Sequence, residues 1–113
     1  MQREFVRLPE FEKCWQSMGL SEDDIRKLEE TLCEDPQKSD LIRGTGGLRK
    51  LRWPLPDKSK SRSIRVVYVD FVVYERIYFI TAYPKSKKDN LTDVERKEIR
   101  KLIELLSKEL KRK

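Results

Sequence analysis

Two runs of β-branched and aromatic residues, separated by only three residues, constrain the fold of this chain more than any other feature. The runs span residues 64–73 and 77–83, and residues of these kinds favour β-strands. The link between them, residues 74–76, is too short for the helical crossover that parallel neighbours need. The chain is therefore predicted to contain an antiparallel β-hairpin.

The first third of the chain predicts a strand followed by two helices. Residues 4–8 read as a short strand, and Pro9 suits the first turn of a helix that runs through Met18 and stops at Gly19. Ser21 then begins an amphipathic helix that ends near Pro36. Acidic residues fill the first turn of this second helix, where the helix dipole favours them.

The rest of the chain supplies another strand and a last helix. Residues 37–47 are predicted to form a glycine-rich loop, residues 48–53 a strand, and residues 54–63 a polar loop. Thr92 and Glu95 match a capping box at the start of the last helix. One apolar stripe on that helix is expected to pack on the sheet; it consists of Ile99, Leu102, Ile103, Leu106 and Leu110.

These elements predict an α+β fold: a small, mainly antiparallel sheet of about four strands, with two N-terminal helices and one C-terminal helix. The 113 residues fit one domain, 1–113. No apolar run approaches the roughly 20 residues that span a bilayer. The sequence therefore predicts a cytoplasmic protein that does not associate with membranes.

Charge is divided unevenly along the chain. Residues 1–37 carry five Lys/Arg against ten Asp/Glu, whereas residues 38–113 carry 21 against ten. Such an asymmetry indicates that the second part holds a polyanion. The alternative is a basic surface that only keeps the protein soluble.

Basic side chains are densest on the predicted strands and loops of residues 43–65, where Asp57 is the one acid. A phosphate can neutralise such a group, because a guanidinium offers it a planar fork of donors. Arg65 starts an otherwise apolar strand, where a charge is costly unless it faces a cleft. The alternative for Arg65 is an ion pair with Asp57 or Asp89. The basic residues are Arg43, Arg49, Lys50, Arg52, Lys58, Lys60, Arg62 and Arg65.

A second basic group follows the last strand: Tyr83, Lys85, Lys87 and Lys88. Because the two strands of the hairpin pair, this group is expected to abut Arg65. An aromatic ring can stack on an unpaired base while cations hold the flanking phosphates. The alternative for Tyr83 is an ordinary sheet residue with its hydroxyl in solvent.

The sequence contains no histidine and two cysteines, Cys14 and Cys33. This composition excludes the imidazole pair of common ribonucleases and a zinc site, and we predict neither a metal nor a cofactor. The segment around Gly44, Gly46 and Gly47 leads into a strand, so it is not a nucleotide-binding loop.

RNA can be cut without a metal, because its own 2′-OH can attack the neighbouring phosphorus. This reaction needs a base, an acid and positive charge on the phosphate oxygens. Lysine has a reference pKa of about 10.4, which neighbouring cations and desolvation lower. A crowded Lys/Arg site can therefore supply all three requirements.

Several segments, in order along nearly the whole chain, resemble toxins of the RelE/HigB branch of the RelE/ParE superfamily. They are GLSEDDIRKLEETLCEDP (19–36), GTGGLRKLRW (44–53), SIRVVYV (63–69), IYFITAYPKSKKDNLT (77–92) and the final amphipathic helix. The GTGGLRK run and the Tyr-x-Lys after the last strand carry the resemblance together.

The resemblance implies a toxin of a type II toxin–antitoxin module that cleaves mRNA on the ribosome without a metal. It assigns the catalytic positions to Arg65, Tyr83, Lys85 and Lys60. Substrate binding would fall to Arg49, Lys50, Arg52, Lys58, Arg62, Lys87 and Lys88. The implied partners are an antitoxin, in this branch often one with a helix-turn-helix domain, and the ribosome with its mRNA.

Two other functions remain open from the sequence. One is a ParE-like toxin that poisons gyrase and cuts no RNA, and the other is a remnant that only binds nucleic acid or antitoxin. The cations around Tyr83 and Lys85 favour the ribonuclease.

Overall fold

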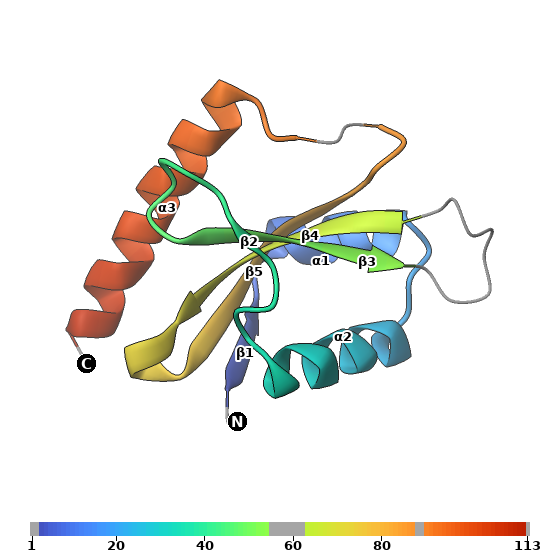
Figure 1. Ribbon diagram of the computed structural model, residues 1–113, viewed down its shortest axis with the longest axis horizontal. Helices are drawn as coiled ribbons and strands as arrows, with labels where there is room; N and C mark the ends of the chain where they lie inside the picture. The colour runs from blue at the N-terminus through green and yellow to red at the C-terminus, as the bar shows by residue number, and fades with distance from the viewer. Residues whose placement is uncertain (1–2, 55–62, 88–89, 113) are drawn as a thin grey trace.

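The computed structural model describes residues 3–54, 63–87 and 90–112, and shows a five-stranded sheet with three α-helices (Figure 1). The strands lie in the order β1-β5-β4-β3-β2. The elements are β1 (Glu4–Arg7), α1 (Pro9–Ser17), α2 (Glu22–Glu34), β2 (Asp40–Leu41), β3 (Leu48–Pro54), β4 (Ser63–Phe71), the 3-10 helix η1 (Val72–Tyr74), β5 (Arg76–Pro84) and α3 (Asp93–Lys111). The predicted strand 64–73 therefore ends two residues early, because its last two residues begin the 3-10 turn into β5. The predicted α+β fold is confirmed.

The helix boundaries follow the signals in the sequence. Pro9 occupies the first turn of α1, and Gly19 beyond its end has a φ of +74°. Ser21 caps α2 and Thr92 caps α3, each in a reciprocal capping box with the acidic residue three positions later. These boxes satisfy backbone N–H groups that the first helical turn leaves without partners.

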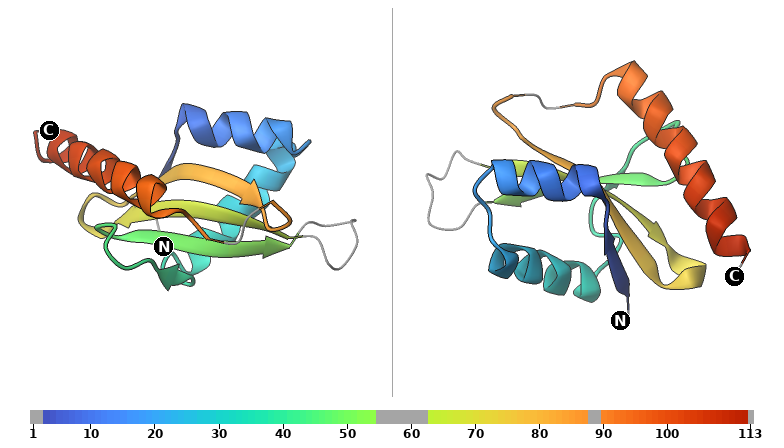
Figure 2. Two further views of the ribbon diagram at one scale, coloured as in Figure 1. Left: turned by 90° about the horizontal axis from the view of Figure 1, so that it is seen from above. Right: turned by 180° about the vertical axis from the view of Figure 1, so that it is seen from behind.

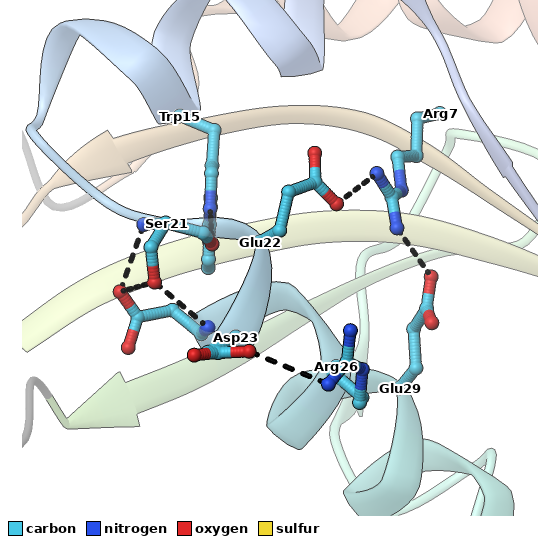
Figure 3. A network of polar contacts seen from close by, with 8 residues as sticks. Arg7, Trp15, Ser21, Glu22, Asp23, Arg26 and Glu29 are labelled. Atoms are coloured by element: carbon cyan, nitrogen blue, oxygen red, sulfur yellow. Dashed lines mark hydrogen bonds and ion pairs between the residues drawn. The ribbon is translucent and has the colours of Figure 1, made fainter.

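Polar contacts join β1 to α2, and α1 to the cap of α2 (Figure 3). Arg7 of β1 pairs with Glu22 at 2.8 Å and with Glu29 at 3.4 Å, both on α2. The indole N–H of Trp15 donates to the carbonyl of Ser21 at 3.1 Å, which ties α1 to the cap of α2.

The sheet has one strand and one pairing that the sequence patterns did not predict. Strand β1 pairs with β5 in parallel, and the two-residue β2 pairs antiparallel with β3. The remaining pairings, β3 with β4 and β4 with β5, are antiparallel as expected. Strand β2 lies in the segment 37–47, which was predicted to be a loop. The sequence did not indicate this strand, because two residues are too few to show an alternating pattern.

Each face of the sheet has its own apolar core. On one face, α1 and α2 pack on β4 and β5 through Phe11, Trp15 and Leu28. On the other, α3 packs on the sheet through Ile103 and Leu110, with the rest of its predicted stripe against the same cluster. Figure 2 shows that α1 and α3 lie apart, toward opposite ends of the twisted sheet. The core role predicted for the α3 stripe is confirmed.

The glycine-rich segment before β3 is a tight turn beside α3. Gly46 and Gly47 have φ of +80° and +120°, and a Cβ on Gly46 would lie 3.7 Å from Ile103 Cγ2. The buried Thr45 accepts from the backbone N–H of Leu48 at 3.1 Å and donates to the carbonyl of Ile42 at 2.6 Å. The segment thus shapes the β2–β3 connection.

Within the described residues, no helix combines the length and apolar character needed to cross a membrane.

Candidate functional site

Three predicted site residues lie in one row across the sheet. Arg65 of β4 is in register with Arg52 of β3 on one side and with Tyr83 of β5 on the other. Residues directly opposite each other on neighbouring strands project to the same face. Arg52, Arg65 and Tyr83 therefore share a face, and it is the one that α3 covers further along the strands, where Val67 and Val69 are buried.

A β-bulge places Tyr83 on this face. Val67 pairs with Thr81 while the next residue, Tyr68, pairs with Phe79, so Ile80 is an extra residue in β5. A bulge of one residue reverses the alternation of every side chain beyond it. With an unbroken register Tyr83 would pair with Ile64 and project to the α1–α2 face, away from Arg65.

An open cleft of about 410 Å³ lies beside this row, between β2, β3 and β4. Lys50, Arg52 and Arg65 supply cations from two strands to its wall, and Lys38 supplies another from the chain before β2. A cleft in which positive charges outnumber negative ones concentrates anions. The described residues that line it are Lys38, Ser39, Asp40, Lys50, Leu51, Arg52 and Arg65.

Arg65 is the most deeply placed cation of the cleft, with 3% of its surface exposed. Its Nη1 donates to the hydroxyl of Ser63 at 3.4 Å. The carbonyl of Ser63 in turn accepts from the backbone N–H of Lys85 at 3.1 Å. Ser63 therefore links the arginine to the segment that follows β5.

Tyr83 lies next to Arg65 but inside the core rather than in the cleft. It is 6% exposed, belongs to the cluster under α3, and its hydroxyl oxygen is buried. Arg65 lines the cleft although it is 3% exposed, whereas Tyr83 is not among the described residues that line it, so its ring presents no face there on which a base can stack. The position of Tyr83 therefore suits the support of Arg65 better than direct contact with a nucleotide.

Lys85 and Lys87, which follow β5, are exposed. Lys85 and Lys87 lie in the turn beyond the strand, where the backbone N–H of Lys87 donates to the carbonyl of Pro84 at 3.1 Å. Further along, Asn90 Oδ1 accepts from Lys50 Nζ at 2.8 Å. This bond ties the β5–α3 connection to the wall of the cleft.

Arg49, a predicted substrate-binding residue, lies on the opposite face of the sheet. It is in register with Tyr68, which belongs to the core under α1 and α2. Its Nη1 donates to the carbonyl of Ser39 at 2.6 Å and to that of Gln37 at 3.4 Å. Because side chains alternate along a strand, Arg49 and Arg52 cannot project to the same face. The structure thus gives Arg49 a role in holding the chain before β2.

The other predicted site residues lie outside the described residues: Lys58, Lys60, Arg62 and Lys88. The same holds for the two carboxylates weighed as partners of Arg65, Asp57 and Asp89.

Sequence reasoning missed Lys38, Ser39 and Asp40, which line the cleft. They precede or belong to the two-residue β2, and only its pairing with β3 brings them beside Lys50. Polar residues are common in loops, so nothing in the sequence indicated that these three residues lie beside Lys50.

The chain matches no protein-family profile. Among solved structures, it is similar to the E. coli toxin RelE, in a mutant with arginines replaced by alanine and in the free state, with a TM-score of 0.55 and 16% sequence identity. The similarity covers 79% of this chain and 90% of that one. The fold predicted from the resemblance is therefore confirmed: this chain has the fold of the RelE toxin.

Proposed function

We propose that this protein is the toxin of a type II toxin–antitoxin module and that it cleaves mRNA on the ribosome without a metal. One observation carries the proposal: Arg52 and Arg65 are in register on neighbouring strands and line one cleft together with Lys50. The likeness of the fold to RelE supports the assignment as a toxin.

In this reaction the phosphate would bind at the row formed by Arg52 and Arg65. Guanidinium groups donate paired N–H bonds to phosphate oxygens, and the fork shape fits the charge that develops when phosphorus becomes five-coordinate. Arg65 is mostly shielded from water, so its attraction for that charge is less screened than at the surface.

The chemical step is an internal displacement. The 2′-oxygen forms a bond to phosphorus while the bond from phosphorus to the 5′-oxygen breaks, which leaves a 2′,3′-cyclic phosphate and a 5′-OH. A base takes the 2′-OH proton and an acid protonates the leaving oxygen. Lys85 and Lys60 are the proposed proton-transfer groups, and the backbone N–H of Lys85 donates to the carbonyl of Ser63, the residue whose hydroxyl accepts from Arg65.

The remaining predicted residues act around this centre. Tyr83 supports Arg65 from the core, while Lys50 and Lys87, with Lys58, Arg62 and Lys88, would contact flanking phosphates. A cognate antitoxin, of the helix-turn-helix type in our proposal, would hold the toxin inactive in the cytoplasm.

The test is primer extension on a translated mRNA after induced expression of wild type, Arg65→Ala and Arg43→Ala. Arg43 is the matched control, because it is an exposed arginine of the same basic run that does not line the cleft. We expect new 5′ ends within codons for the wild type and Arg43→Ala, and a loss of at least about a hundredfold for Arg65→Ala.

Intact mRNA together with a supercoiling defect would instead assign the protein to the gyrase poisons. Intact mRNA with neither toxicity nor a supercoiling defect would leave only a binding protein.

A further inference from the structure

We infer that Asp40 is a specificity-determining residue, which reads the base of a guanine nucleotide beside the phosphate held by Arg65; this inference rests on the proposed function. Asp40 is the one carboxylate among the described residues that line the cleft. Its neighbours there are the cations Lys38, Lys50 and Arg52.

The sheet register places Asp40 away from the phosphate site but on the same face. Asp40 is in register with Lys50, and Lys50 lies two residues before Arg52 on β3, on the same face. Two strand spacings across the sheet and two residues along it put the Asp40 and Arg65 Cα atoms roughly 12 Å apart. This separation suits contact with a base whose own phosphate, or the next, lies on Arg65.

A carboxylate in a phosphate-binding cleft repels the backbone of RNA, whereas it attracts the hydrogen-bond donors of a base. An ionised carboxylate only accepts hydrogen bonds, and its two oxygens can bind two adjacent donors at once. The Watson–Crick edge of guanine presents such a pair, the ring N1–H and the exocyclic amino group. Adenine, cytosine and uracil each place an acceptor beside their donor on that edge.

The chain before Asp40 is anchored on both sides, as a residue that discriminates between bases requires. The Ser39 carbonyl accepts from Arg49 at 2.6 Å. The buried Tyr68 hydroxyl donates to the carbonyl of Pro36 at 2.9 Å and lies 2.7 Å from Ser39 Oγ. Because a phenol has one proton, Ser39 is the donor in the second bond. Asp40 thus extends from a fixed backbone.

The test is a binding cycle with short RNAs that carry 2′-O-methyl groups and cannot be cut. One set contains a single guanine, and the matched set contains inosine there, which lacks only the amino group. Wild type is expected to bind the guanine RNA about tenfold more tightly than the inosine RNA, since a charged hydrogen bond is lost. Asp40→Asn and Asp40→Ala should bind both alike.

Glu34→Gln is the control, because it removes one negative charge from an exposed site on α2 and should keep the preference. Equal binding of the two RNAs by wild type, or a preference that survives in both Asp40 variants, would overturn the inference.

A parallel map of cleavage sites on programmed ribosomes separates this inference from the proposed function. Asp40→Asn should cut at a comparable total rate with less guanine at the cut sites. A uniform loss of cutting at every site would show that Asp40 serves the chemistry or the fold, and would overturn the inference. Wild type that shows the binding preference but makes no cuts would overturn the proposed function alone.

Discussion

Arg65 shows how the position of one side chain changes its chemistry. At the surface an arginine and a lysine both attract phosphate, but at a buried position the shape of the donor group matters more. A guanidinium is weakly hydrated and presents fixed parallel N–H bonds, whereas an ammonium is a strongly hydrated point charge. Burial at 3% exposure therefore favours arginine at this position.

We therefore expect that Arg65→Lys, which keeps the charge, will not keep the activity. We expect cleavage to fall by about tenfold or more, because the lysine cannot donate two parallel bonds to the phosphate. Single-turnover cleavage on programmed ribosomes measures the effect, and the melting temperature of the variant shows whether it is folded. A rate equal to that of wild type would mean that only charge is needed.

Tyr68 predicts a dependence of stability on pH. Burial raises the pKa of Tyr68, so the folded state holds the phenol proton more tightly than the unfolded state. The stability that Tyr68 contributes is then complete below the unfolded pKa of about 10 and is lost as the pH rises through the folded pKa. Tyr68→Phe removes the hydrogen bonds to Pro36 and Ser39. It should lower the free energy of unfolding at pH 7 by about 1–2 kcal/mol.

The difference in the free energy of unfolding between wild type and Tyr68→Phe should become smaller above about pH 10. Urea unfolding of both proteins at pH 7, 9 and 10.5 measures it. A difference that stays constant or widens with pH would contradict the buried, hydrogen-bonded state of this phenol.

At the scale of elements, a side chain that precedes β1 holds this strand in the sheet. Arg3 forms a two-pronged ion pair with Asp70 of β4, with Nε to Oδ1 at 2.8 Å and Nη2 to Oδ2 at 3.3 Å. The bond to Asp70 raises the pKa of Arg3. Strand β5 lies between β1 and β4, so this pair reaches across it and holds the parallel β1 at the edge.

Asp70→Ala should therefore destabilise the protein by about 3 kcal/mol, because it leaves a buried guanidinium without its carboxylate. The control is Glu104→Ala, which breaks an exposed ion pair with Arg100 on α3 and should cost at most about 0.5 kcal/mol. Chemical denaturation provides both values. Equal effects would show that the Arg3–Asp70 pair does not secure β1.

The elements also show how far the sequence predicts this structure. Local signals sufficed for the three helices and the β4–β5 hairpin, because caps and apolar spacing act within a few residues. The parallel pairing of β1 and the two-residue β2 depend on contacts distant in sequence. So does the extra residue Ile80, which brings Tyr83 to the face of Arg65.

At the scale of the whole molecule, the fold turns a charge asymmetry along the chain into one in space. Helices α1 and α2, which come from the acidic part, cover one face of the sheet. Three cations of the cleft, Lys50, Arg52 and Arg65, project from the other face. The sequence singled out Arg65 within the basic run 43–65, but it gave Arg49 and Arg52 the same substrate-binding role. The structure separates Arg52, in the cleft, from Arg49, on the opposite face, and from Arg43, beside the turn next to α3.

The central claim is that cations of β3 and β4 meet at one phosphodiester. The most direct measurement compares Arg52→Gln with Arg43→Gln in single-turnover cleavage of mRNA on programmed ribosomes. Both variants lose one exposed arginine, so non-specific attraction to RNA falls equally. We expect Arg52→Gln to cut at least about tenfold more slowly than wild type and Arg43→Gln to stay within about twofold. Equal losses in the two variants, or no loss in Arg52→Gln, would contradict a phosphate site in this cleft.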